Sequence, residues 1–359
     1  MAHTTYFLGA NSKDGFYSLM DRLIDPAEAR AIYILKGGPG CGKSSLMKKV
    51  GQAAQDAGCC PQYIYCSGDP DSLDGLVIDE WGVALCDGTA PHIAEPSYPG
   101  AVERYVNLGA CYDTAGLATH KKEIMELMGG YQGAYRRAYR CLKGAGQLIE
   151  DNLELLETDA LKAKIKKRAK GIIAREIPKH GTGGKVTERF LSALTCKGQV
   201  CLFETANELC KHIYELADSY GLAHLLLEEL LGAAAERGHD AVVCPDPMAP
   251  SRLQHLLLPG LGVAFVTGSP ELPYPGKPYR RIRLDAMADQ EELRRHKARI
   301  RFSRKVARAL LDEGMETLAA EKELHDALEK VYNPYVDFDR VYAMADEVIG
   351  EILELAAKL

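Results

Sequence analysis

The sequence predicts an α/β protein in which one arrangement occurs twice: a parallel sheet unit with its helices, followed by an α-helical segment. Three observations lead to this prediction. Short apolar runs alternate with helical patterns, a set of residues recurs at a nearly constant spacing, and two long stretches carry apolar stripes at helical periodicity. The length of 359 residues agrees with more than one domain.

The sheets are predicted from apolar runs that are too short for helices. In the first half these runs are Ile32 to Lys36, Gln62 to Cys66 and Val83 to Cys86, and a helical pattern from Lys43 to Ala57 separates the first two. In the second half the runs are Val200 to Phe203, Ile213 to Leu216, Ala241 to Cys244 and Leu261 to Val266. Alternation of short apolar runs with helices is typical of a parallel sheet.

The two halves are predicted to be copies of one unit, because residues of the first half recur in the second. The matched pairs include Phe7 with Phe190, Ala10 with Ala193, Val83 with Val263, and Ala84 with Ala264. The spacing is 183 positions at the first pair and 180 at the last, as small deletions in a duplicated ancestor would produce. The predicted boundaries are residues 1–118 and 179–287 for the two units, and 119–178 and 288–359 for the helical segments.

The helical segments are predicted from apolar residues at steps of three and four, such as Leu142, Ala145 and Ile149 in the first segment. We expect the two segments to pack on each other. Glycines in the first segment argue against one continuous helix there. These glycines are Gly129, Gly130, Gly133, Gly144 and Gly146.

The most specific motif is GGPGCGKSS, which places Gly37, Gly42, Lys43 and Ser44 in the register GxxxxGK[ST]. A predicted strand precedes the motif and a predicted helix follows it, which is the context of a phosphate-binding loop. In such a loop, backbone amides and a helix N-terminus face the phosphates. The residues predicted to bind nucleotide are Gly37, Gly38, Pro39, Gly40, Cys41, Gly42, Lys43, Ser44 and Ser45. The alternative is a glycine-rich turn with no ligand.

A phosphate-binding loop also needs a carboxylate at the end of a neighbouring strand, to hold the metal ion. We predict Asp87, because it ends a run whose residues recur in the second half. Asp79 and Glu80, in LVIDE, are the alternative, and their counterparts Pro259 and Gly260 favour a strand edge or turn. Lys43 and Asp87 are therefore predicted to be catalytic, and Ser44 and Asp87 to bind Mg²⁺. ATP and Mg²⁺ are the predicted cofactors.

Three further residues near the motif have two interpretations each. Asp69 follows a predicted strand and is a candidate catalytic base, although Asp-Pro-Asp-Ser is also common turn chemistry. His92 is a candidate contact to the γ-phosphate or a structural loop residue. Cys41 precedes a helix N-terminus, where a thiol pKa tends to fall and oxidation becomes easier, or it is simply a small residue tolerated in the loop.

The second copy of the loop reads DSYGLAHLL, from Asp218 to Leu226. His224 or Ala223 stands at the lysine position, depending on where a one-residue gap falls, and Thr267 stands in place of Asp87. Loss of the lysine and the acid predicts poor polyphosphate binding. The second half is therefore predicted to be a degenerate site with a scaffolding or regulatory role.

Composition and charge limit the partners. The formal net charge is −6, so the overall field does not attract nucleic acid, although the basic segments Lys162 to Arg168 and Arg294 to Arg308 leave local binding open. The expected partner is a nucleotide. No membrane partner is expected, a homo-oligomer or a protein partner is left open, and we expect a cytoplasmic location. An arginine that completes the site is expected in one of these segments or at Arg280 or Arg281.

The chain resembles a family of uncharacterised bacterial tandem P-loop ATPases, in which a P-loop NTPase unit is duplicated. The resemblance covers nearly the full length and rests on FLGANSKDG, IYILKGGPGCGKSSLMKK and GVALCDGTAPH in the first half, and on FLSALTCKG and GLGVAFVTGS in the second. It implies ATP binding at Lys43, Ser44 and Asp87 without defining a substrate. Members of the family commonly keep the second loop intact, so this chain departs from their pattern.

The function predicted from these features is that of a Mg-dependent ATP-binding protein and ATP hydrolase, with one active loop in the N-terminal half. One alternative is a small-molecule or nucleoside kinase, in which Asp69 is the base. Another is a nucleotide-responsive binding module with negligible turnover, because no clear glutamate follows Asp87. A GTPase is disfavoured because the NKxD tetrapeptide is absent from the sequence.

Overall fold

The computed structural model describes residues 3–89 and 94–358. The first unit contains β1 (Thr4–Phe7), β2 (Gly9–Ser12), β3 (Gly15–Ser18), η1 (Met20–Arg22), β4 (Ala31–Lys36), α1 (Lys43–Asp56), β5 (Gln62–Tyr65), β6 (Leu73–Ile78), η2 (Asp79–Trp81), β7 (Val83–Asp87), β8 (Glu103–Asn107) and η3 (Leu108–Cys111). Helices α2 (Thr114–Thr119), α3 (Lys121–Leu156) and α4 (Asp159–Glu176) follow it.

The second unit repeats this order. It contains β9 (Val186–Glu188), β10 (Ser192–Thr195), β11 (Gly198–Cys201), α5 (Phe203–Leu209), β12 (His212–Ala217), α6 (Ala223–Glu236), β13 (Ala241–Pro245), β14 (Leu253–Leu258), η4 (Pro259–Leu261), β15 (Val263–Gly268), β16 (Arg280–Arg283) and η5 (Asp285–Met287). Then come α7 (Gln290–Arg295), α8 (Lys297–Tyr332), η6 (Asn333–Tyr335) and α9 (Phe338–Ala356).

Each unit is built on a six-stranded sheet, and the two sheets share one topology. The strand orders are β1-β5-β6-β7-β4-β8 and β9-β13-β14-β15-β12-β16. The α/β class is thus confirmed, but the prediction of a parallel sheet is wrong at one strand of each unit. Strands β6 and β14 run antiparallel to both of their neighbours.

The antiparallel strand has a local cause. After β6 the chain reverses through the short 3₁₀ turn η2 and returns directly as β7, and Gly82 closes this turn with φ +62°. A connection this short can join only antiparallel neighbours. The same reversal occurs at η4 and Gly262 in the second unit.

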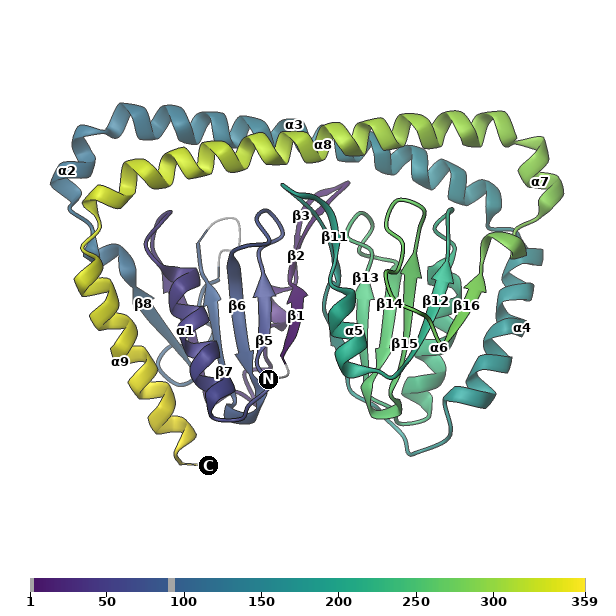
Figure 1. Cartoon of the computed structure of the whole chain (residues 1–359), viewed down its shortest axis with the longest axis horizontal. Helices are drawn as coiled ribbons and strands as arrows, with labels where there is room; N and C mark the ends of the chain where they lie inside the picture. Colours follow the sequence, from purple (N-terminus) through teal and green to yellow (C-terminus); the bar gives the residue numbers. More distant parts are fainter. Residues whose placement is uncertain (1–2, 90–93, 359) are drawn as a thin grey trace.

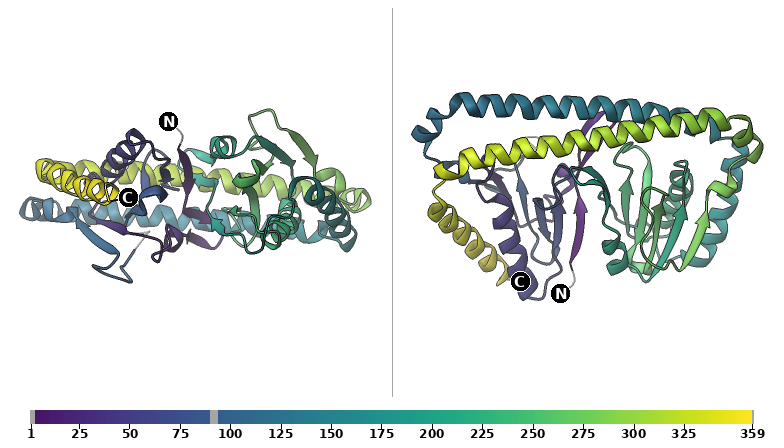
Figure 2. Two further views of the ribbon diagram at one scale, coloured as in Figure 1. Left: turned by 90° about the horizontal axis from the view of Figure 1, so that it is seen from below. Right: turned by 45° about the horizontal axis from the view of Figure 1, so that its top comes forward.

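The helical segments join the two units. Helices α3 and α8 lie side by side along the top of the molecule and run in opposite directions (Figures 1 and 2). This confirms that the two segments pack on each other. The structure describes α3 as one continuous helix, contrary to the expectation from its glycines. A Cβ on Gly144 would lie 3.2 Å from Leu310 of α8, and one on Gly146 would lie 2.6 Å from Lys13, so close packing compensates for weak helix propensity there.

The last helix of each segment packs on the opposite unit (Figure 1). Ile165, Ala169 and Ile172 of α4 belong to the core of the second unit, together with α6. Val341, Ala345 and Val348 of α9 belong to the core of the first unit, together with α1. The two units therefore exchange their final helices.

A third core joins the facing sides of the units. It includes Phe7, Ile34 and Val77 from the first unit and Phe190 and Val266 from the second. Phe7 and Phe190 also exchange backbone hydrogen bonds of 2.9 Å. Among the residues that the structure describes, no helix is long and apolar enough to cross a bilayer.

Candidate functional site

The motif residues form a loop between the end of β4 and the start of α1. Gly40 and Gly42 have φ of +70° and +86°, a backbone conformation that favours glycine. Gly42 is the N-cap of α1, and Lys43 is the first helical residue. Pro39 lies within the loop, and Ser45 is exposed on the first turn of α1. The loop thus places the positive end of the α1 dipole at the carboxyl edge of the sheet.

The Lys43 side chain folds back over the loop. Its Nζ donates to the carbonyl oxygens of Gly37 and Gly38, at 2.8 and 3.0 Å, and lies 3.6 Å from Oδ2 of Asp87. The ammonium group is therefore held at the loop mouth by two carbonyl groups and one carboxylate. Ser44 lies beside it, and its Oγ accepts from the backbone N–H of Leu73, at 3.1 Å.

Asp87 ends β7, which pairs in parallel with β4 and places Asp87 opposite Leu35. Thr89 donates to Oδ1 of Asp87 through its backbone N–H, at 2.8 Å, and through its hydroxyl, at 2.5 Å. Burial raises the pKa of the Asp87 carboxyl, while Lys43 and Thr89 oppose this rise. Because the Asp87 carboxylate is poorly solvated, a nearby cation stabilises its charged form.

The alternative acids lie at the other edge of the sheet. Asp79 and Glu80 follow β6, which runs antiparallel to β7 with Ile78 opposite Val83. Asp79 accepts from Gln62 and Glu80 from the backbone of Cys60. The structure therefore brings Asp87, and neither of these two acids, to Lys43.

The remaining predicted residues have varied surroundings. Cys41 is buried, and burial raises the pKa of its thiol despite the nearby Lys43, so the idea of a lowered pKa is wrong. Asp69 makes the predicted turn, accepting from Asp71 N–H at 3.1 Å and from the Ser72 hydroxyl at 3.2 Å. His92 lies outside the described residues.

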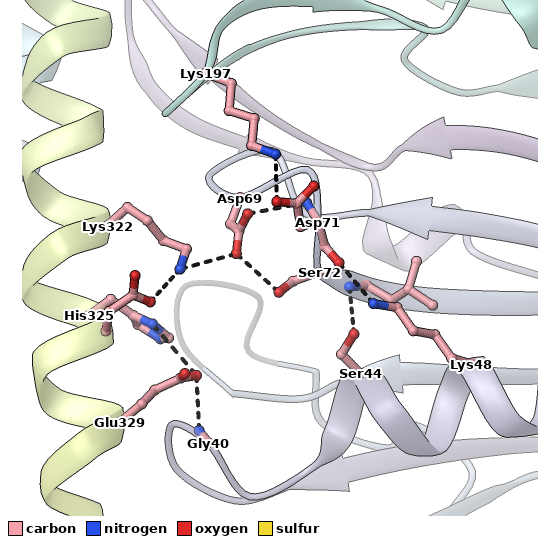
Figure 3. A network of polar contacts seen from close by, with 12 residues as sticks. Gly40, Ser44, Lys48, Asp69, Asp71, Ser72, Lys197, Lys322, His325 and Glu329 are labelled. Carbon is pink, nitrogen blue, oxygen red and sulfur yellow. Dashed lines mark hydrogen bonds and ion pairs between the residues drawn. The ribbon is translucent and has the colours of Figure 1, made fainter.

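Helix α8 contributes groups to the loop that the sequence did not reveal (Figure 3). Oε1 of Glu329 accepts from the backbone N–H of Gly40 at 3.1 Å, and His325 Nδ1 lies 3.8 Å from the same oxygen. Lys322 forms an ion pair with Asp69 at 3.4 Å. A Cβ on Gly40 would lie 2.3 Å from Asn333, so η6 also contacts the loop closely. These residues follow the motif by almost 300 positions, and no local pattern marks them.

The hairpin β10–β11 of the second unit also reaches this region. Lys197 at its tip forms an ion pair with Asp71 at 2.5 Å (Figure 3). Cys196 N–H donates to the Gly68 carbonyl at 3.0 Å. The site is thus assembled from the loop of one unit, a hairpin of the other and a long helix that spans both.

The corresponding loop of the second unit is filled by its own side chain. Asp218 takes the place of Gly37, and its carboxylate accepts from the backbone N–H groups of Tyr220, Gly221 and Ala223, at 3.0, 2.9 and 2.7 Å. Ala223, the first residue of α6, stands at the Lys43 position. The amides that would face a phosphate are therefore already bonded to an anion.

The basic segments lie with the second unit. Lys162 to Arg168 belongs to α4, and Arg304 and Arg308 line a cavity beside the second loop. Arg281 forms two hydrogen bonds with Glu215, of 2.7 and 2.6 Å, and Arg280 lies over the ring of Tyr279. The structure does not bring these arginines to Lys43.

Comparisons with family models, with curated proteins and with solved structures find no match to this chain. The arrangement at the loop is therefore interpreted from its own chemistry. It combines a helix N-terminus, an ammonium group, a hydroxyl and a desolvated carboxylate within one short stretch of the sheet edge. These are the groups that hold the terminal phosphates and the metal ion of a nucleoside triphosphate.

Proposed function

We propose that the first unit binds ATP with Mg²⁺ at the loop from Gly37 to Ser45 and hydrolyses it. The observation that carries this proposal is the proximity of Lys43 to Asp87, 3.6 Å apart, at the start of α1. A lysine in this place pairs with the β- and γ-phosphates, and the backbone amides of the loop surround them. When a nucleotide binds, its phosphate oxygens would replace the carbonyl oxygens of Gly37 and Gly38 as partners of Lys43.

The residues also fit a magnesium ion. Asp87 is a buried carboxylate whose raised pKa reflects missing solvation, and a divalent cation would restore that solvation. The hydroxyl of Ser44 lies at the adjacent position of the loop. Ser44 and Asp87 would hold Mg²⁺, which supplies charge neutralisation on the phosphates when it is bound.

Glu329 gives the proposal a second element. Its carboxylate bonds to Gly40 N–H, one of the loop amides that would face the phosphates. Two anions cannot share that amide at low cost, so nucleotide binding would displace Glu329. If the end of α8 moves together with the Glu329 side chain, the movement reaches the second unit, because α8 extends over that unit (Figure 1). Occupancy of the first unit would thereby be transmitted along α8.

The test is a thermal-shift screen of nucleotides with and without Mg²⁺, followed by turnover measurements on the best binder. A higher midpoint temperature with ATP and Mg²⁺ is expected, because a ligand that binds only the folded state stabilises it. Release of ADP and phosphate from ATP and water supports hydrolysis. ADP release only with an added acceptor supports a kinase, and binding without ADP supports a nucleotide-responsive module. No shift with any nucleotide contradicts the proposal.

A further inference from the structure

Strand β6 contains a β-bulge beside the loop of the first unit. Against β5, Tyr65 pairs with Leu73 and Ile64 pairs with Gly75, so Asp74 is the extra residue between them. A bulge redirects side chains and bends its strand, and bulges are frequent next to functional sites. The backbone N–H of Leu73 donates to Oγ of Ser44 at 3.1 Å. The bulge therefore lies directly against the start of α1.

On its other side, β6 brings Asp74 to Asp87. Leu76 of β6 lies opposite Leu85 of β7, and both belong to the core beneath α1. Two residues further along this antiparallel register, Asp74 lies opposite Asp87, and residues two apart share one face of a sheet. Because β6 runs antiparallel to β7, its first residues lie at the carboxyl edge of the sheet, where the loop is.

The two carboxylates have little solvent and are close enough to influence each other. Asp74 is only 5% exposed. Burial raises the pKa of the Asp87 carboxyl, and the negative charge of Asp74 adds to that rise. Poorly solvated carboxylates on adjacent strands repel each other, whereas a divalent cation held by both would be attracted to each. Mg²⁺ binds oxygen ligands and is commonly held by one or two carboxylates together with phosphate oxygens.

The second unit keeps the bulge and has neither acid. Its register against β13 shifts after Cys244, and Gln254 is the extra residue. Gln254 thus stands in place of Asp74, and Thr267 stands in place of Asp87. The Thr267 hydroxyl donates to the Gln254 carbonyl, so these two positions are in contact in the second unit. The bulge itself does not need a carboxylate, and both acids are missing from the unit that also lacks the lysine.

We propose that Asp74 is a second carboxylate of the nucleotide site and holds Mg²⁺ together with Asp87 and Ser44. This inference rests on the proposed binding of ATP and Mg²⁺ at the first unit and adds a residue to that site. When it is bound, the metal ion neutralises charge on the phosphates. The carboxylate of Asp74 would hold the ion from the side of β6, opposite the position from which Lys43 approaches the phosphates.

The test compares nucleotide binding with and without the metal ion, by isothermal titration calorimetry on the full-length protein. The probe is the non-hydrolysable ATP analogue AMP-PNP, in excess Mg²⁺ or in EDTA. In the wild type, Mg²⁺ should lower the Kd at least tenfold. Asp74→Asn keeps the shape of the side chain and should reduce this gain at least fivefold. Its Kd in EDTA should be unchanged or lower, because a negative charge near the phosphates is removed.

Two further variants complete the experiment. Asp79→Asn makes the same substitution at an exposed position beyond the far end of β6, and it should keep the full wild-type gain from Mg²⁺. Asp74→Gln introduces the residue that the second unit holds in the same bulge, so the fold accepts that side chain. If Asp74→Asn does not fold, as judged by its urea unfolding curve, Asp74→Gln decides the outcome.

Three results would overturn the role of Asp74 alone. They are a full gain from Mg²⁺ in the Asp74 variant, equal binding of AMP-PNP to the wild type with and without Mg²⁺, and a Kd that rises as much in EDTA as in Mg²⁺. The last result would show that Asp74 supports the structure of the loop instead of the metal ion. A wild-type protein that binds no AMP-PNP in either condition would overturn the proposed function, and this inference with it.

Discussion

The two loops of this protein occupy the same place in the same topology and have opposite chemistry. In the first, Lys43 lies over an amide-lined turn beside a buried carboxylate. In the second, Asp218 bonds to the amides of its own loop, and the lysine and the strand-end acid are absent. The comparison shows that the same loop position is kept without the lysine, with an internal carboxylate bonded to the loop amides.

The long helices extend this difference. Glu329 lies 32 residues after the start of α8, and Leu153 lies 32 residues after the start of α3. Glu329 bonds to Gly40, whereas a Cβ on Gly221 would meet Leu153 at 4.0 Å. A polar helix face therefore covers the first loop, and a mainly apolar one covers the second. Four predictions test or refine this contrast.

The largest expected effect is on nucleotide affinity. Lys43→Ala should weaken ATP binding about a hundredfold, roughly 3 kcal/mol, because a charge-assisted contact to phosphate is lost. His224→Ala should leave ATP affinity unchanged, since His224 bonds to the Gly221 carbonyl and Glu157 in the second unit. Calorimetric titration with ATP and Mg²⁺ measures both. Equal loss in the two variants would contradict the one-site interpretation.

The next effect is on stability. Asp218→Ala leaves the N–H groups of Tyr220, Gly221 and Ala223 without their acceptor. Only the Ala223 group is buried, so the free energy of unfolding should fall by about 1 to 3 kcal/mol. Asp240→Ala, which removes one exposed bond to Lys185 N–H, should cost less than about 1 kcal/mol. Urea unfolding at neutral pH compares the two. An Asp218→Ala protein as stable as the wild type would show that the anion is not needed.

A third prediction concerns pH. Burial raises the pKa of Glu321 on α8 to about 7, so the folded state keeps a proton there that the unfolded state releases near pH 4.5. Stability should therefore fall as the pH rises between these values. Glu321→Gln should remove this fall and gain about 2 to 3 kcal/mol over the wild type at pH 8. The corresponding residue of α3 is Ala145, so α3 has no carboxyl group at this position.

The measurement is urea unfolding of both proteins at pH 5, 6, 7 and 8, with the difference between them taken at each pH. Other titrating groups, including Asp69, Lys322 and Asp326 close to Glu321, are common to both proteins and cancel to first order. A difference that stays constant from pH 5 to pH 8 would rule out a neutral Glu321.

The smallest expected effect is on the ATP affinity of a protein that lacks the carboxylate of Glu329 on α8. Glu329→Gln should tighten ATP binding three- to tenfold, about 1 kcal/mol, because a negative charge next to the loop amides is removed while the side-chain size is kept. Glu323→Gln, at an exposed position of the same helix, is the matched control. If Glu329→Gln weakens ATP binding, Glu329 supports the nucleotide instead of competing with it.

The sequence predicted the parts of the site that depend on short segments. Lys43 and Ser44 follow from the motif, and Asp87 could be chosen over Asp79 because its run recurs in the second half. Strands β6 and β14 were missed, since the predicted runs do not include them, and an apolar run would not have shown which way either strand runs. Likewise, the apolar stripe that includes Val341, Ala345 and Val348 indicated a buried helix face, but not that this helix packs on the first unit.

Glu329, Lys322 and His325 could not be found from the sequence for a similar reason. Their approach to the loop depends on the length of α8 and on its packing against α3, which are properties of the whole fold. Acidic and basic residues on an exposed-looking helix are ordinary. The packing of α8 along α3 brings these three residues to the region of the loop and Asp69. The same packing places Asn152 in the wall of the cavity in the second unit.

The exchange of α4 and α9 has a consequence for how the chain is made. The strands of the first unit end at Asn107, but the helix that completes its core begins only at Phe338. At about 5 to 20 residues per second, a ribosome needs some tens of seconds to supply it. Throughout that interval the nascent first unit exposes the apolar surface later covered by Val341 and Val348, a surface of the kind that chaperones bind.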